Sequence, residues 1–307
     1  MNNFKELKSF VKGIFLENEL MSKHTSYGIG GPASAYIVPK DRFDLSNILK
    51  FAKKYSVPTY FIGSGSNLLV SDDGIDGLVL SPAKSLKQLK INSPYVDAEA
   101  GVMLGKLVKE TIKNNLTGLE SLVGVPGTLG GALIMNAGAF GGEISSYLIK
   151  VDLMNMDGNI YKYDADDINF SYRNSTFKSN EFILSAKFIL NKDDPNAIKE
   201  KRDFASKGRK SNQPLRYRSA GSVFKNTPTH AAGYLIDQAG LKGTRIGDAE
   251  ISTHHANFFI NKGSATASDV IALIELTKST VLKKFDVELE LEIKTIGFKN
   301  NNYLINE

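Results

Sequence analysis

Two glycine-rich segments contain the residues best suited to bind a phosphate group or a flat ring. The first, IGSGSN at residues 62–67, lacks the G-x-G-x-x-G spacing of a dinucleotide-binding fingerprint, because position 68 is leucine. Its two glycines could still turn backbone N–H groups toward a pyrophosphate, and its serine and asparagine side chains would add donors. An ordinary turn between two strands is the alternative, and this segment alone does not decide between them.

The second segment, GVPGTLGGALIMNAGAFGGE at residues 124–143, crowds glycines into an apolar stretch. Glycine at this density costs chain entropy, so a fold retains it where backbones approach closely or dihedral angles are unusual. A flat ligand lying against the backbone would supply such a reason, with Thr128 and Asn136 as polar contacts. A glycine-rich packing motif between sheets is an equally good interpretation of the segment alone.

Two further segments carry polar side chains that could act on a bound ligand. SAGSVFKN at 219–226 places Ser222 and Lys225 beside a glycine, and FSYRNS at 170–175 supplies Arg173. No G-x-S-x-G elbow is present, so Ser222 is not predicted to be a hydrolase nucleophile. A serine beside glycine is usually a turn residue, and a lone arginine is usually a surface charge.

The remaining candidates lie closer to the C-terminus. Glu292 belongs to an alternating stretch with three glutamates on one face, which is typical of a solvated strand face. His254 and His255 could form a metal-binding pair, but nearby carboxylates lack any ligand spacing, and we interpret the pair as part of a polar loop.

The elements that would position these residues alternate between helices and short strands in the first part of the chain. Hydrophobic periodicity predicts the helices, and Pro58 restarts the chain as a strand. Asp157-Gly158 between two strand-like runs predicts a hairpin turn. The expected helices cover residues 41–56 and 103–115, and the expected strands cover 59–62, 68–70, 78–80 and 182–190.

The composition becomes polar and charged over residues 193–214, where we expect a helix, a link ending at proline and a domain boundary. Residues 230–240 and 268–285 have helical patterns. Ser268 is placed to cap the second of these helices, with Asp269 in its first turn. Residues 287–297 alternate as one strand, with the hydrophobic residues on one face and the glutamates and Lys294 on the other.

Composition narrows the class of protein. The 307 residues are 42% hydrophobic, enough for two or three domains, and the absence of cysteine excludes disulfides and thiolate catalysis. The N-terminus predicts an amphipathic helix rather than a signal peptide or membrane span. The net charge is +5, and the sequence has no stripe of basic residues interleaved with aromatic ones, which argues against nucleic-acid binding. We expect a cytoplasmic protein. The predicted apolar face of the N-terminal helix consists of Phe4, Leu7, Phe10, Val11 and Ile14.

Taken in order, these segments resemble the UDP-N-acetylenolpyruvoylglucosamine reductase family over nearly the whole chain. The two glycine-rich segments are shared more widely with flavoproteins of the vanillyl-alcohol-oxidase type. The matching pieces are TSYGIGGPA (25–33), GSGSNLLV (63–70), GLESLVGVPGTLGGALIMNAGAFGGE (118–143), YRNSTFK (172–178), QPLRYRSAGSVFKN (213–226), AGYLIDQAGLKGTRIG (232–247), STHHANFFIN (252–261) and LELEIKTIG (289–297).

The resemblance implies an α+β fold with a two-part FAD-binding region of the vanillyl-alcohol-oxidase type and a C-terminal α+β substrate-binding domain. We place an N-terminal FAD-binding subdomain at residues 1–86 and a second at 87–205. The substrate-binding domain would cover 206–307, with its last strand returning toward the active site.

The resemblance also implies roles for individual residues. Ser222 would donate a proton, with Arg173 and Glu292 as its catalytic companions, and no metal is expected. The substrate would contact Lys225, Asn226 and His255. FAD would be bound without a covalent link by Gly63, Ser64, Gly65, Ser66, Asn67, Gly124, Gly127, Thr128, Gly130, Gly131, Asn136, Ala137 and Gly138.

The implied reaction reduces UDP-N-acetylglucosamine enolpyruvate to UDP-N-acetylmuramate with NADPH as hydride donor, in peptidoglycan precursor synthesis. The chain resembles the shorter class of the family, because only residues 178–181 separate YRNSTF from the next strand. It departs from the usual family pattern at Arg216, Arg218 and Asp248, which affects expected substrate contacts rather than the reaction.

Two other functions remain open from the sequence. One is an FAD-dependent sugar or alcohol oxidase of the same flavoprotein group, and the other is a non-catalytic flavin-binding module. Cysteine is absent, and neither glycine-rich segment contains a histidine that could tether FAD. We expect a monomer or weak oligomer whose partners are NADPH and the enolpyruvyl ether of a UDP-sugar, with no nucleic-acid or membrane partner.

Overall fold

The computed structural model describes residues 2–299, with side chains from Phe4 onward. The chain forms two compact units, and each unit collects three separate stretches of sequence. The first unit contains the residues up to Asn18, then Ser34–Ser64 and Gly77–Arg209. The second contains Glu19–Ala33, Gly65–Asp76 and the residues from Lys210 onward. The three-part domain division expected from the sequence stays a prediction.

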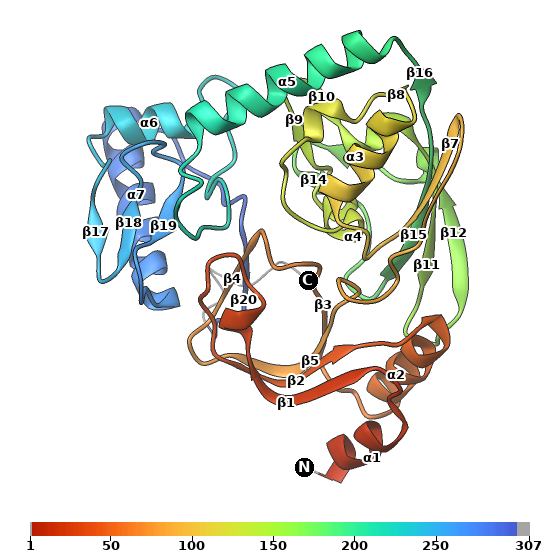
Figure 1. Ribbon diagram of the computed structural model, residues 1–307. Coiled ribbons are helices and arrows are strands. Elements are labelled where there is room, and N and C mark those ends of the chain that lie inside the picture. Colours follow the sequence, from red (N-terminus) through yellow and green to blue (C-terminus); the bar gives the residue numbers. More distant parts are fainter. Residues whose placement is uncertain (1, 300–307) are drawn as a thin grey trace. The chain divides into compact units, whose positions relative to one another are not determined.

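A four-stranded sheet with the order β1-β2-β5-β3 begins the fold (Figure 1). Its strands are β1 (Ile14–Leu20), β2 (Pro32–Val38), β5 (Ile75–Leu80) and β3 (Thr59–Phe61), and the helices near it are α1 (Asn2–Phe10) and α2 (Arg42–Lys54). Asp41 caps α2, because its side chain accepts hydrogen bonds from the backbone N–H groups of Phe43 and Asp44. The buried face of α2 joins Leu7, Ile37 and Leu78 in one hydrophobic cluster.

A five-stranded antiparallel sheet makes up most of the first unit. Its strands lie in the order β12 (Ile160–Asp164), β11 (Leu148–Met154), β15 (Phe182–Ile189), β7 (Tyr95–Glu99) and β6 (Leu89–Asn92). One face packs against α3 (Leu104–Lys113) and α4 (Leu129–Ile134), with Leu107, Leu133 and Phe188 in the shared core.

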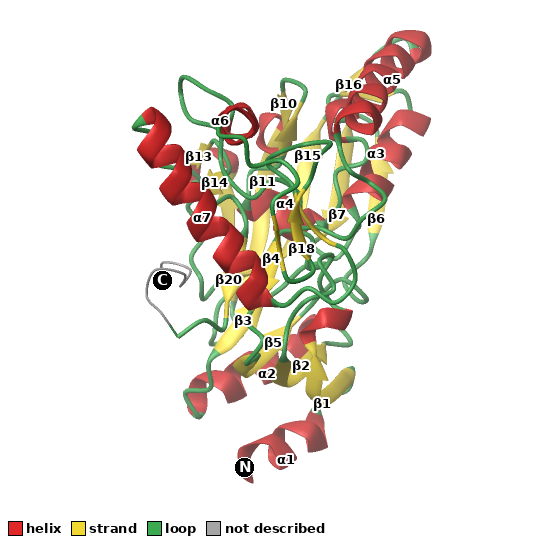
Figure 2. Ribbon diagram, turned by 90° about the vertical axis from the view of Figure 1, so that its left-hand side faces the viewer, coloured by secondary structure: helices red, strands yellow, loops and turns green. Residues whose placement is uncertain are grey.

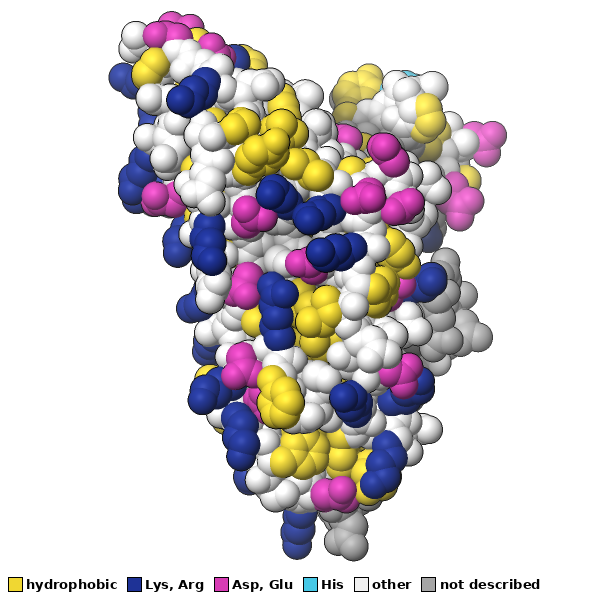
Figure 3. Space-filling view, turned by 90° about the vertical axis from the view of Figure 1, so that its right-hand side faces the viewer, with side chains coloured by type: hydrophobic (Ala, Val, Ile, Leu, Met, Phe, Trp, Pro, Cys, Tyr) yellow, Lys and Arg dark blue, Asp and Glu magenta, His cyan; other side chains and the backbone are white. Residues whose placement is uncertain are grey.

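The other face of this sheet is charged. Lysines and carboxylates stand opposite one another across the strands, as in the pairs Lys150↔Asp164 and Lys187↔Asp97. Opposite charges in such pairs stabilise a sheet modestly. Figure 3, which views the side of β7 and β12, shows both signs interspersed over the surface without a patch of one sign.

The second unit is built on the three-stranded antiparallel sheet β17 (Arg245–Ile246), β18 (Ala249–Ile251) and β19 (Phe259–Asn261). Helices α6 (Ala232–Gln238) and α7 (Ala267–Phe285) share its hydrophobic core (Figure 2). A parallel pair, β4 (Leu68–Val70) with β20 (Lys294–Ile296), joins an early segment to the end of the described chain.

Short elements complete both units. Helix α5 (Pro195–Asn212) contains the position at which the first unit ends. The remaining strands are β8 (Leu116–Thr117) paired with β16 (Asn191–Lys192), β9 (Gly138–Ala139) with β10 (Gly142–Glu143), and β13 (Phe170–Ser171) with β14 (Asn174–Ser175). The 3-10 turns are η1 (Met21–Lys23), η2 (Glu120–Leu122), η3 (Ile144–Tyr147) and η4 (Ala165–Asp167).

Two predictions about element ends are wrong. The N-terminal helix ends at Phe10, and Ile14 begins β1 instead of completing the helical face. Gly13 turns the chain there, where a Cβ would lie 1.9 Å from the Val38 carbonyl oxygen. Residues 287–297 do not form one strand, since only β20 is regular, although Leu289 and Ile293 are buried as the alternation predicted.

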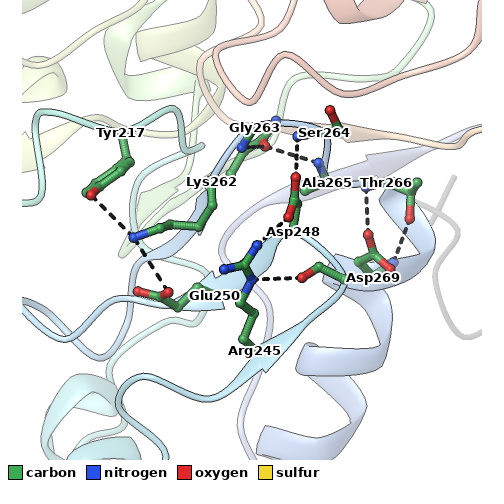
Figure 4. A network of polar contacts seen from close by, with 12 residues as sticks. Tyr217, Arg245, Asp248, Glu250, Lys262, Gly263, Ser264, Ala265, Thr266 and Asp269 are labelled. Carbon is green, nitrogen blue, oxygen red and sulfur yellow. Dashed lines mark hydrogen bonds and ion pairs between the residues drawn. The ribbon is translucent and has the colours of Figure 1, made fainter.

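The cap of α7 is Thr266 and not Ser268 (Figure 4). The Thr266 hydroxyl accepts from the Asp269 N–H at 3.1 Å, and the Asp269 carboxylate accepts from the Thr266 N–H at 2.9 Å. This reciprocal pair is a capping box. Ser268 instead donates its backbone N–H and hydroxyl to the carboxylate of Asp72.

Within residues 2–299, no helix combines the length and the apolar character that crossing a bilayer demands.

Replacing Thr266 with alanine should lower the free energy of unfolding by about 1 kcal/mol, because it removes the oxygen that caps α7. Urea denaturation at neutral pH measures the change. Ser279→Ala, on the exposed surface of the same helix, is the matched control and should change stability little. Equal effects of both substitutions would contradict the assigned cap.

Candidate active site

The two glycine-rich segments meet in the first unit at Gly63 and Thr128. A Cβ added at Gly63 would lie 2.4 Å from Oγ1 of Thr128, so a larger residue would force the segments apart. Thr128 is fully buried and caps α4, accepting from the Gly131 N–H at 3.4 Å. Gly127 has a φ of +132°, a region that favours glycine. The close approach predicted from glycine density is therefore present at this point.

Asn136 leaves an unsatisfied acceptor in the same unit. Its side chain is fully buried, and its Nδ2 donates to Glu143 Oε2 at 2.9 Å and to the Ser171 carbonyl at 3.2 Å. Its Oδ1 has no hydrogen-bond partner among the described residues. Because an unsatisfied buried acceptor is costly, this oxygen fits a ligand that brings an N–H donor, as a flavin ring does.

Arg173 lies beside the same segment. Its Nη2 donates to the carbonyl of Gly138 at 2.9 Å, and its guanidinium stacks over the ring of Tyr172. The structure thus places Arg173, which was proposed as a catalytic residue, beside Gly138 and Asn136 of the segment that was proposed to bind FAD. Glu143 orients Asn136 but was not predicted as a site residue. The only feature of the sequence that pointed to it was its position seven residues after Asn136.

Asn67, in the second unit, ties the end of the first glycine segment to the C-terminal part of the chain. Its Nδ2 donates to the Glu292 carbonyl at 3.1 Å, and its own carbonyl accepts from the Lys294 N–H at 2.9 Å. Gly65, with a φ of +68°, packs so closely that a Cβ there would lie 2.0 Å from the His24 carbonyl oxygen. The turn is therefore fixed by backbone contacts.

Ser222, Lys225 and Glu292 come together on two neighbouring segments of the second unit. The Glu292 N–H donates to the Val223 carbonyl and the Lys225 N–H donates to the Glu290 carbonyl, both at 2.8 Å. Segments 222–225 and 290–293 therefore run side by side. Backbone pairing places the three predicted residues, which are far apart in sequence.

Two charged residues accompany this group and were not predicted as site residues. Glu290 forms an ion pair with the ammonium group of Lys225. Lys294 is half-buried, and burial lowers its pKa, with nearby Lys225 acting in the same direction and Glu290 opposing it. The feature of the sequence that could have indicated Lys294 was the alternation of residues 287–297, which placed it on the same face as the glutamates.

Asn226 and His255 have structural partners. Asn226 Oδ1 accepts from the Ala232 N–H at 3.0 Å at the start of α6. His255 Nδ1 accepts from the Asn257 N–H at 3.2 Å, and burial lowers the pKa of the His255 ring. Burial therefore favours the neutral form of the His255 ring, which suits a hydrogen-bonding role better than a charged one.

The unusual residues Arg218 and Asp248 make contacts within the second unit. The guanidinium of Arg218 occupies the space beside Gly28, where a Cβ would lie 2.0 Å from Nη1. Asp248 accepts from the Ser264 N–H at 2.8 Å and pairs with Arg245, and both interactions lower its pKa (Figure 4). Asp248 thus stabilises its own hairpin.

Two family models match separate parts of the chain. Residues 33–164 match the family model of an FAD binding domain, and residues 213–296 match that of the UDP-N-acetylenolpyruvoylglucosamine reductase C-terminal domain. The reductase of that name from Clostridium novyi is 41% identical over 300 residues, covering 97% of each chain. The one from Caldanaerobacter subterraneus is 42% identical over 296 residues, covering 96% of this chain and 98% of the relative.

A solved structure of a reductase with the same name is also similar to this chain. The crystal structure of the reductase from Thermus caldophilus superposes with a TM-score of 0.79 at 33% sequence identity, covering 94% of this chain and all of that one. The chain is therefore an FAD-containing oxidoreductase with a mixed α+β fold. It belongs to the UDP-N-acetylenolpyruvoylglucosamine reductase family.

The lowered pKa of the half-buried His255 makes stability depend on pH. Its folded pKa is below the ordinary value of 6.5, so the unfolded chain binds more protons between the two values. We expect the free energy of unfolding to fall as the pH drops below about 6.5, with one proton limiting the slope to about 1.4 kcal/mol per pH unit.

Denaturant unfolding between pH 7 and pH 5 measures this effect. His255→Asn keeps an acceptor near the position of Nδ1 and should flatten the dependence. The same substitution at the exposed His254 is the control and should leave the pH dependence of stability unchanged. If the free energy of unfolding of His255→Asn fell with pH as steeply as that of the parent, the loss of stability at low pH would come from other groups.

Proposed function

We propose that this protein reduces UDP-N-acetylglucosamine enolpyruvate to UDP-N-acetylmuramate with NADPH, in the synthesis of peptidoglycan precursors in the cytoplasm. The observation that carries the proposal is the pairing of segments 222–225 and 290–293, which brings Ser222, Lys225 and Glu292 together in a chain of this family. A monomer or weak oligomer, acting without a nucleic-acid or membrane partner, is part of the same proposal.

The residues proposed to hold FAD fit such a ligand. Thr128 and the glycines on both sides of it offer backbone close to a flat ring, and Asn136 Oδ1 offers an unused acceptor. The turn at 63–67 offers backbone N–H groups toward a pyrophosphate. When bound, the flavin would accept a hydride from NADPH and pass it to the methylene carbon of the enolpyruvyl group.

Arg173 would bind the carboxylate of the substrate. Hydride addition to the methylene carbon places negative charge on the neighbouring carbon and its carboxylate. A guanidinium can hold that carboxylate with two parallel hydrogen bonds and remains charged. Arg173 Nη2 is oriented by the Gly138 carbonyl, so the side chain is preorganised.

Ser222 would supply the proton. The Ser222 O–H bond breaks as the new C–H bond forms at the carbon next to the carboxylate, and the hydroxyl is later restored by a proton from solvent. Serine is a weak acid, so nearby positive charge is needed to stabilise the oxygen left behind. Lys225, three residues after Ser222 in the sequence, would supply such charge, and Glu292 would orient the substrate or share the proton.

Ser222→Ala should separate the two half-reactions. Reduction of the flavin by NADPH, followed anaerobically, should stay within a few-fold of the parent. Reoxidation by the enolpyruvyl substrate should slow by about 10²–10⁴-fold, as is typical for a lost general acid. Ser219→Ala, in the same loop, is the matched control and should leave both rates unchanged. Equal slowing of both half-reactions would show that Ser222 shapes the site instead.

Arg173→Lys and Glu292→Gln should each slow reduction of the substrate while the protein stays folded. Lysine keeps the charge but loses the two-pronged geometry, and loss of a preorganised donor typically costs about 10²–10³-fold. Steady-state turnover with NADPH measures the effect, with Arg202→Lys on the surface as control. Near-parent turnover in both variants would refute these two assignments, and NADPH-independent oxygen consumption with sugars would favour the oxidase alternative.

A further inference from the structure

The turn between β9 and β10 contains a residue that its backbone conformation disfavours. Ala139 pairs with Gly142, so Phe140 and Gly141 form a two-residue hairpin loop with φ values of +49° and +81°. Such a turn prefers Asn-Gly, and a bulky residue in the left-handed region is a genuine outlier. Phe140 is also 44% exposed, so burial of its ring alone does not account for it.

The C-terminal part of α5 receives the Phe140 ring. The Phe204 ring meets it edge-on with centroids 6.0 Å apart, and the Arg209 guanidinium lies 5.8 Å from its centroid. Gly208 leaves room for the ring, because a Cβ there would lie 2.7 Å from Phe140 Cε1. Arg209 is itself anchored, since its Nε donates to the Val123 carbonyl at 3.1 Å.

The strands of this hairpin orient two of the polar residues proposed for the site in the first unit, Asn136 and Arg173. Gly138 pairs with Glu143 across the ladder. The Gly138 carbonyl accepts from Arg173, and the Glu143 carboxylate accepts from Asn136. A shift of the hairpin would therefore displace both partners together.

We propose that Phe140 is a positioning residue, whose ring, seated on α5 by Phe204, Gly208 and Arg209, fixes the hairpin so that the Gly138 carbonyl orients Arg173. Strained conformations persist where surrounding structure enforces them, and they concentrate at functional sites. The inference rests on the proposed function, in which Arg173 binds the substrate carboxylate. Phe140 acts through the hairpin and does not itself take part in the chemistry.

Two substitutions at position 140 distinguish the effect of the aromatic ring from the effect of the turn conformation. Phe140→Asn gives Asn-Gly, which favours the turn but removes the ring, whereas Phe140→Tyr keeps the ring. We expect Phe140→Asn to slow flavin reoxidation by the enolpyruvyl substrate by about 10- to 100-fold, as a small displacement of a binding group does. Phe140→Tyr should remain close to the parent. Parent-like rates in Phe140→Asn would overturn the proposal.

A second readout does not depend on turnover. The dissociation constant of the product, UDP-N-acetylmuramate, measured by calorimetry on the FAD-loaded protein, should rise several-fold in Phe140→Asn. In an Arg173→Lys background the same substitution should have little further effect, because the two residues act through one contact. Additive effects of the two substitutions would overturn the proposal.

Controls distinguish this inference from the proposed function. If Arg173→Lys leaves reoxidation unchanged, the role of Arg173 fails and the positioning role falls with it. If Arg173→Lys slows reoxidation and Phe140→Asn does not, only the positioning role is wrong. Phe43→Ala, an exposed aromatic on α2, should behave as the parent. Gly208→Ala crowds the ring without changing the turn, and it should slow reoxidation in the same direction even where Phe140→Asn folds poorly.

Discussion

The close approach of the Gly63 backbone to the side chain of Thr128 is the constraint on which the candidate site in the first unit depends. A Cβ at Gly63 would clash with Oγ1 of Thr128, so the first glycine segment begins directly against the residue that caps α4. The other end of that segment is fixed by Asn67, whose side chain and backbone bind the chain at Glu292 and Lys294. A turn held at both ends keeps its N–H groups in place without a ligand, which lowers the cost of ordering a dinucleotide when one binds.

In the second unit, backbone hydrogen bonds position the segments that carry the catalytic candidates. Val223 and Glu290 supply the carbonyl groups, so Ser222, Lys225 and Glu292 depend on register more than on side-chain contacts. This explains how the chain accommodates its departures from the family pattern. Arg218 packs beside Gly28 and Asp248 stabilises its own hairpin, so neither disturbs the paired segments.

Much of the fold followed from the sequence, because α2, α3, α6 and β15 have clear periodicity and the Asp157-Gly158 turn has clear chemistry. Strands β1 and β2 were not predicted, since their side chains do not alternate. The cap of α7 was assigned to Ser268 and not to Thr266, because the reciprocal hydrogen bonds between Thr266 and Asp269 that define the cap are visible only in the structure. Glu290 and Lys294 were missed because they act on Lys225, which is distant in sequence, and Glu143 was missed because its contact with Asn136 depends on a hairpin that was not predicted.

The pairing of β4 with β20 sets a condition on the order in which the chain can fold. Asn67 and Glu292, which flank this pair, are 225 residues apart in sequence, and closing so long a loop is slow. Since the ribosome delivers β20 long after β4, β4 lacks its ladder partner while the intervening chain is synthesised. Loss of β20 through early termination or proteolysis would therefore leave β4, an early segment of the chain, without its pairing strand among the described residues.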